Sequence, residues 1–199
     1  MRRTRAQVFL LAVLVTGLVA CSPHAQRTAA GKEPAGATFE PVAQVLRHPR
    51  CLNCHTASDY PRQGDDRHPH RFLVARGLDD HGAYGQRCNE CHQGQNQNNG
   101  VPGAHGWRLA PLTMAWETEP GKPLSTASLC RRLLDQSHNG NRNLAQLEQH
   151  LQTEPLVQWA WAPGHTVEGS PRALPPLTHE QFLHAFRTWT AAGAPCPHE

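Results

Sequence analysis

Two five-residue segments of this chain combine thiols and an imidazole at a spacing that suits one kind of chemistry. Residues 51–55 read CLNCH and residues 88–92 read CNECH. Both match Cys-x-x-Cys-His, in which two cysteines attach a c-type haem. On a helical turn the first, fourth and fifth residues share one face, so the imidazole can reach the iron as its proximal ligand. The sequence predicts two covalently bound haem c, attached through Cys51, Cys54, Cys88 and Cys91 and ligated by His55 and His92.

Paired cysteines also serve two other kinds of chemistry. Two Cys-x-x-Cys pairs could bind one zinc ion, and a single pair could act as a redox dithiol. Neither explains why a histidine follows both pairs. The motifs start at positions 51 and 88, only 37 residues apart. Two tandem single-haem domains do not fit this interval, so we expect one compact fold that holds both haems close together.

The second axial ligand of each iron must come from outside the motifs. Met114 lies in residues 109–116, a loop with proline and tryptophan that resembles the distal-ligand loop of many cytochromes c. Ligation by methionine would raise the potential of that haem, whereas the alternative role for Met114 is to fill a gap in the core. The chain has no other methionine after its export signal, so one iron must take a histidine, another ligand or an open site.

Several histidines are candidates for the remaining axial position. His150 lies beside the apolar stripe of a predicted helix at residues 144–151, where a buried haem could contact it. His68 and His70 lie between the two motifs. We rank His150 and His70 ahead of His68. The other candidates are His81, His105 and His138.

The first twenty residues are typical of an export signal. Three arginines precede an apolar run at residues 8–15 that is too short, at about 12 residues even when extended, to span a membrane comfortably. Residues 18–21 (LVAC) resemble the lipobox of bacterial lipoproteins, which predicts lipidation of Cys21. The alternative is an ordinary signal peptide with a cysteine near its cleavage site. We therefore divide the chain into a lipoprotein signal peptide (1–20), a flexible tether (21–37) and a dihaem domain (38–199).

The seven cysteines agree with this division. One would carry lipid and four would carry haem. Cys130 and Cys196 are left, and in an exported protein a disulfide between them is the default. The alternative is two free thiols.

The formal charge of +3 gives no support for a nucleic-acid partner. Three arginines belong to the export signal, so cleavage brings the charge to about zero, and haem propionates would make the mature protein neutral to slightly acidic. The 17 prolines and 16 glycines predict long loops.

Helix-start signals precede four apolar stripes, and no run of alternating strand residues is evident. These signals are Pro41 before residues 42–46, Ser125 before 129–134, Asn143 before 144–151, and Thr178 before 182–189. The predicted fold is mostly α and loop-rich, a cytochrome c-like domain organised around both haems.

Four longer stretches carry a family resemblance. They are residues 48–55 (HPRCLNCH), 63–68 (QGDDRH), 102–111 (PGAHGWRLAP) and 156–164 (LVQWAWAPG). They resemble small dihaem c-type cytochrome lipoproteins that are labelled isoquinoline 1-oxidoreductase subunits and associated with molybdenum hydroxylases. The likeness implies an electron-acceptor role with a molybdenum hydroxylase as partner. Residues 167–170 depart from the family pattern.

We expect a dihaem cytochrome on the periplasmic side, anchored by lipid to a membrane, with the outer membrane slightly favoured. It would transfer electrons between a dehydrogenase or molybdenum hydroxylase and a respiratory acceptor, and would not be an enzyme by itself. The alternative is a dihaem enzyme such as a peroxidase, with one open iron. A haem-based sensor would need a signalling domain, which the sequence does not suggest.

Overall fold

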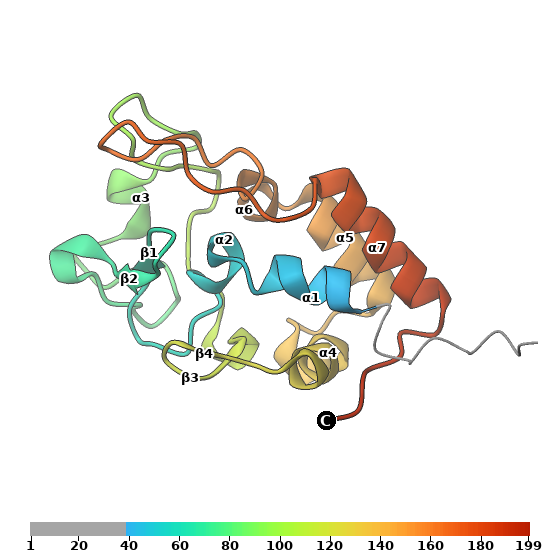
Figure 1. Ribbon diagram of the computed structural model, residues 1–199. Coiled ribbons are helices and arrows are strands. Elements are labelled where there is room, and N and C mark those ends of the chain that lie inside the picture. The colour runs from blue at the N-terminus through green and yellow to red at the C-terminus, as the bar shows by residue number, and fades with distance from the viewer. Residues whose placement is uncertain (1–38) are drawn as a thin grey trace, which may run out of the picture. The chain divides into compact units, whose positions relative to one another are not determined.

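The computed structural model describes residues 39–199, which belong to one compact unit. The predicted export signal, the lipidation site Cys21 and the predicted tether lie outside the described residues. In the described part, helices and loops dominate (Figure 1), which confirms the prediction of a mostly helical, loop-rich fold.

The elements follow one another with short helices and 3-10 turns between the longer helices. They are α1 (Glu40–Leu46), α2 (Pro49–Leu52), β1 (Arg62–Gln63), β2 (His68–Pro69), η1 (Arg71–Leu73), α3 (Cys88–Cys91), η2 (Leu112–Met114), β3 (Glu117–Glu119), β4 (Lys122–Pro123), α4 (Thr126–Leu134), η3 (Gln136–His138), α5 (Leu144–Thr153), α6 (Pro155–Trp159) and α7 (His179–Ala191).

The core lies among α1, α4, α5 and α7, on the right of Figure 1. Helix α1 packs against α4 and α7, and α5 packs against α6 and α7. Trp189 of α7 is fully buried, with its ring centroid 4.8 Å from that of Phe39 and 5.5 Å from that of Phe186. Burial of these large apolar side chains stabilises the helical part of the molecule.

Local capping explains where the longer helices begin. The Ser125 hydroxyl accepts a hydrogen bond from the backbone of Ser128 at the start of α4. Asn143 and Thr178 each form a capping box. Each side chain accepts from the backbone N–H three residues later, where a glutamine side chain accepts from the backbone N–H of the cap residue. Pro41 lies in the first turn of α1. All four predicted helix starts are confirmed.

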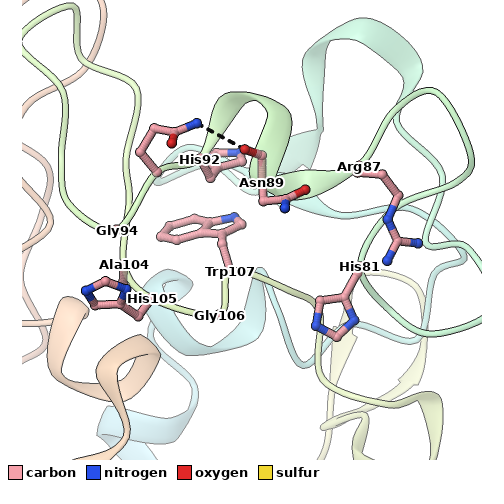
Figure 2. Close-up of a pocket in the computed structure, with 10 residues that line it drawn as sticks. His81, Arg87, Asn89, His92, Gly94, Ala104, His105, Gly106 and Trp107 are labelled. Atoms are coloured by element: carbon pink, nitrogen blue, oxygen red, sulfur yellow. Dashed lines mark hydrogen bonds between the residues drawn. The ribbon is translucent and has the colours of Figure 1, made fainter.

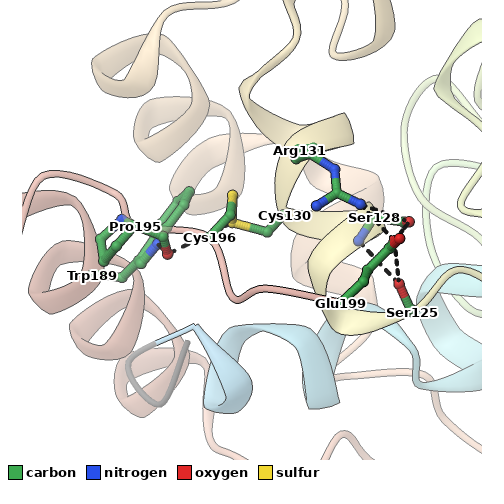
Figure 3. The surroundings of a disulfide bond; sticks show 8 residues. All are labelled: Ser125, Ser128, Cys130, Arg131, Trp189, Pro195, Cys196 and Glu199. Atoms are coloured by element: carbon green, nitrogen blue, oxygen red, sulfur yellow. Dashed lines mark hydrogen bonds and ion pairs between the residues drawn. A yellow bond between two sulfur atoms is a disulfide. The ribbon is translucent and has the colours of Figure 1, made fainter. Parts of the chain in front are cut away.

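A disulfide joins α4 to the segment after α7 (Figure 3). It links Cys130 and Cys196, the pair expected from the sequence, with Cα atoms 5.6 Å apart. The Trp189 indole donates to the Pro195 carbonyl at 2.9 Å, and Glu199 pairs with Arg131 at 2.5 Å. These contacts fix the end of the chain against the helical core.

Two short hairpins, β1–β2 and β3–β4, were not predicted. Their strands have two or three residues, too few to show an alternating pattern. The β1–β2 hairpin matters for the site because His70 directly follows β2. Within residues 39–199, no helix has the length and apolar character needed to cross a membrane.

Candidate haem-binding site

Each Cys-x-x-Cys-His motif forms a single helical turn. The backbone N–H of His55 donates to the Cys51 carbonyl at 3.0 Å, and that of His92 donates to the Cys88 carbonyl at 2.8 Å. Pro49 begins the first turn, and the His48 imidazole caps it by accepting from the backbone of Arg50. Both turns therefore have the i to i+4 geometry that brings the thiols and the imidazole to one face.

His55 is held by two contacts. Its Nδ1 lies 2.8 Å from the backbone carbonyl oxygen of Met114. Its ring stacks on the indole of Trp116, with centroids 3.6 Å apart and 4° between the planes. The hydrogen bond and the stacking together fix both the position and the plane of the imidazole.

His92 has the same two contacts from different residues. Its Nδ1 lies 2.7 Å from the backbone carbonyl oxygen of Pro102. Its ring stacks on Trp107, with centroids 4.5 Å apart and 7° between the planes. Figure 2 shows His92 above the Trp107 indole, at a cavity of about 340 Å³ that His81 and His105 also line.

The hydrogen bonds determine which nitrogen of each imidazole is free. A carbonyl oxygen can only accept, so Nδ1 must carry the proton and Nε2 must keep its lone pair. Metal-ligating histidines commonly donate their other ring N–H to a backbone carbonyl in this way. Both His55 and His92 are thus prepared to ligate through Nε2.

The protonation of these groups agrees with ligation. Burial lowers the pKa of both His55 and His92 to about 4, so both rings are neutral at pH 7. Burial raises the pKa of Cys51 to about 12 and that of Cys54 to about 11. These two residues are therefore thiols at neutral pH, which does not favour a redox dithiol, because that chemistry needs a thiolate.

The zinc alternative requires a group of ligands that converge. Among residues 39–199, no three His, Cys, Asp or Glu side chains are arranged so that they could hold a metal ion. An axially ligated haem needs no such group, because the porphyrin supplies four of the ligands. The described residues therefore present no assembled four-cysteine zinc site.

The two motifs are close enough for their charges to interact. Burial raises the pKa of Cys54 most, and Cys88 of the other motif raises it further. A segment after Trp107 links the first motif to the chain just before the second. Ala110 donates to the Cys54 carbonyl at 3.2 Å and Leu109 to the Asp80 carbonyl at 2.9 Å, and the next carbonyl, that of His81, accepts from the backbone of Cys88 at 2.8 Å.

His70 lies beside His92. Their ring centroids are 5.9 Å apart, with 72° between the planes. Two imidazoles on opposite sides of one metal ion have centroids about 6 Å apart, because each metal–nitrogen bond is about 2 Å long. The Nδ1 of His70 bonds to the Arg71 carbonyl, so its Nε2 is also free. The spacing is compatible with a bis-histidine pair, and it is also that of an edge-to-face aromatic contact.

Met114 approaches His55 from the Nδ1 side. If a metal ion were bound at Nε2 of His55, a sulfur on the opposite side of that ion would lie about 9 Å from the Met114 carbonyl oxygen. The hydrogen bond, the imidazole ring and two metal–ligand bonds would separate the two atoms. An extended methionine reaches only about 6 Å from its carbonyl oxygen to its sulfur. The Met114 sulfur instead lies 3.4 Å from where a Cβ on Gly140 would stand. The sequence did not assign Met114 to either iron; this geometry does not favour it as the distal ligand of the iron that His55 would hold.

His150 is in the neighbourhood of His55. Burial has the largest effect on the pKa of His55, and the charge of His150 lowers it further. The His150 side chain on α5 is largely buried and lines a cavity of about 350 Å³. Gly140 lies at the same cavity and contacts Met114. His150 is thus the candidate histidine whose charge acts on His55.

Three of the other candidate histidines have partners of their own, and the fourth, His105, lines the cavity beside His92. His68 bonds to the Asp66 carboxylate at 2.7 Å, His138 to that of Asp135 at 2.8 Å, and His81 to the Asp79 carbonyl at 2.6 Å. None of these contacts involves a motif histidine.

Sequence reasoning missed the groups that position the motif histidines. Two of them are backbone carbonyls, and two are tryptophans, Trp107 and Trp116. The signals in the sequence were that a tryptophan and a proline follow His92 within fifteen residues, and that the loop of Met114 contains a tryptophan. No family model, curated protein or solved structure was found to match this chain.

Proposed function

We propose that this chain is a dihaem c-type cytochrome that carries electrons. The observation that supports this most strongly is that His55 and His92 make the same two kinds of contact. Each follows a Cys-x-x-Cys turn, donates Nδ1–H to a backbone carbonyl and stacks on a tryptophan. Two unrelated loops supply the same pair of contacts, as expected if both imidazoles have the same task.

Axial ligation by two histidines at each iron is part of the proposal. His70 would complete the site of His92, in agreement with their 5.9 Å separation. His150 would complete the site of His55. Six-coordinate irons exchange electrons without binding a substrate, which suits a carrier.

When bound, the haems would supply the one-electron chemistry. The chain's own residues would hold the proximal imidazoles in one tautomer and one plane. The imidazoles would therefore move little when the charge of the iron changes. Cys54 and Cys88 are close enough for their charges to interact, which would bring the two haems within range for electron exchange.

The cellular setting is also a proposal. The export signal and the lipobox at Cys21 support a location on the periplasmic side of a membrane, with a lipid anchor. The family resemblance supports redox partners, with a molybdenum hydroxylase or dehydrogenase as donor and a respiratory protein as acceptor.

A second candidate is a dihaem peroxidase. The cavity beside His92 favours it, because His81 and His105 could act there as acid–base groups and Arg87 could stabilise negative charge. An open iron would be required at that site, and the position of His70 does not favour one.

Spin state separates the two candidates. The oxidised protein should give an electron paramagnetic resonance spectrum of two low-spin haems, and hydrogen peroxide should not be turned over. A high-spin haem that reacts with peroxide in the wild-type protein would replace the carrier by the peroxidase.

A further inference from the structure

Two buried side chains of opposite charge meet beside the first motif. The Glu117 side chain has no exposed surface, and that of Arg67 is 13% exposed. A terminal nitrogen of Arg67 donates to one oxygen of the Glu117 carboxylate. Burial raises the pKa of Glu117, but the hydrogen bonds from Arg67, Ala57 and Thr56 outweigh it, so the pKa lies below its usual range. Glu117 is therefore ionised at neutral pH, and the two residues form a buried ion pair.

The ion pair contacts the first motif within its helical turn and directly after it. The terminal nitrogen of Arg67 that meets Glu117 also donates to the Leu52 carbonyl at 3.2 Å. The other carboxylate oxygen of Glu117 accepts from the Thr56 hydroxyl and from the Ala57 backbone, both at 2.8 Å. The pair thus holds the chain on both sides of the motif histidine.

Glu117 directly follows the tryptophan that stacks on His55. The backbone N–H of Trp116 donates to the His55 carbonyl at 2.9 Å, in addition to the stacking of the two rings. Because the Glu117 carboxylate is bonded to Thr56 and Ala57, it holds Trp116 against the segment that carries His55. The plane of the imidazole therefore depends on the ion pair through the stacked indole.

Arg67 lies in the turn of the β1–β2 hairpin, which extends from the first motif to the second. The Asn53 side chain of the first motif donates to the Gly64 carbonyl in the same turn at 2.9 Å. Directly after β2, the His70 ring lies 5.9 Å from that of His92. One hairpin thus connects the first motif to the histidine beside the second.

Stability alone does not explain the geometry of Arg67. Its backbone lies in the left-handed region, with a φ of 57°, which disfavours a side chain of this kind. Its Nε is buried with no hydrogen-bond partner. A buried ion pair is itself a weak stabiliser, because the loss of hydration opposes the attraction. Such strain persists where the surrounding structure determines the position of a residue, and it often accompanies a functional role.

We propose that the Arg67–Glu117 ion pair positions axial histidines at both haem sites. It acts on His55 through the stacked Trp116, and on His70 through the β1–β2 hairpin. This inference rests on the proposed function, because it requires haem at both motifs and His70 as a ligand. Arg67 and Glu117 are positioning residues, since both act through other side chains.

Electron paramagnetic resonance of the oxidised mature protein tests the inference, because the g values of a low-spin haem depend on the orientation of its axial imidazoles. Glu117→Gln keeps the side-chain volume and removes the charge, and should shift the signals of both haems. Glu119→Gln removes the same charge from an exposed position of β3 and is the matched control, expected to shift neither. Variants with alanine at both cysteines of one motif assign each signal.

A role in folding alone would leave the g values unchanged in a folded variant that holds both haems. Unshifted signals in Glu117→Gln, or a shift confined to the haem of the first motif, would therefore overturn the inference. If Glu117→Gln does not fold, Arg67→Met with Glu117→Gln removes both charges and leaves neither one buried alone. This double variant should also shift both signals, and unshifted signals would overturn the inference equally.

Two variants of Arg67 test the link through the hairpin. Arg67→Met removes the ion pair and should shift the signal of the second haem. Arg67→Lys has a single terminal nitrogen that can replace the one in contact with both Leu52 and Glu117, so it should shift that signal less. Equal shifts in the two variants would contradict the role of the ion pair.

The wild-type protein separates this inference from the proposed function. A chain that carries no covalent haem would overturn both together. A chain with two low-spin haems whose signals are insensitive to the substitutions of Arg67 and Glu117 would overturn the positioning role alone.

Discussion

The carbonyl oxygen of Met114 lies 2.8 Å from Nδ1 of His55, so this methionine meets the first motif through its backbone. The contact leaves Nε2 of His55 free on the far side of the ring. It also keeps the Met114 sulfur from reaching the position opposite Nε2 on a metal ion bound there, as the reach of an extended methionine indicates.

Met114 should therefore be replaceable without loss of an axial ligand. We expect Met114→Leu to retain the low-spin spectrum, because the substitution keeps the carbonyl and most of the side-chain volume. The oxidised wild-type protein should lack the weak absorption band near about 695 nm that accompanies Met ligation. A band that is present in the wild type and absent from Met114→Leu would restore Met114 as a ligand.

Each distal histidine should control one haem. His70→Ala is expected to convert the haem of the second motif to high spin, and His150→Ala that of the first. His138→Ala, which removes an imidazole bonded to Asp135, is the matched control and should leave both haems low-spin. Electron paramagnetic resonance of the oxidised variants checks this, and two low-spin signals in His70→Ala would refute the assignment of His70.

Trp116 should stabilise the fold as well as orient His55. It is 7% exposed and belongs to the core cluster. Trp116→Ala is expected to reduce the free energy of unfolding by about 3–5 kcal/mol through the lost contacts and the cavity. Trp116→Phe keeps an aromatic face and should lose less. Denaturant unfolding followed by circular dichroism measures both, and equal losses would show that stacking contributes nothing special.

The disulfide should stabilise the protein without affecting the motifs. Cys130 and Cys196 are separated by 66 residues. The chain-entropy model gives about 4 kcal/mol for a loop of this length. The double variant Cys130→Ser, Cys196→Ser should unfold at correspondingly lower denaturant concentration, with an unchanged visible spectrum. A changed spectrum would mean that the helical core and the haem-binding part are coupled more tightly than proposed.

The helix starts could be read from the sequence because capping is local. Asn143 and Gln146, or Thr178 and Gln181, are three residues apart and need no tertiary contact to form their capping boxes. The motif turns are local for the same reason. The pairing of Cys130 with Cys196 was accessible by elimination, since other roles accounted for the remaining five cysteines.

The partners of the motif histidines could not be predicted in this way. Every residue has a carbonyl, so no residue type marks Pro102 or the backbone of Met114 as the acceptor. The sequence predicted a role for the sulfur of Met114, whereas its backbone carbonyl makes the contact with His55. The hairpin that leads to His70 has two-residue strands, below the length at which periodicity can be recognised.

Intact mass spectrometry after expression with a cytochrome c maturation system tests the central claim most directly. The account predicts that the denatured chain keeps the mass of two haems, that Cys88→Ala with Cys91→Ala keeps one, and that Cys51→Ala with Cys54→Ala keeps one. A wild-type chain that carries no covalent haem, or whose four motif cysteines remain free thiols, would contradict the account.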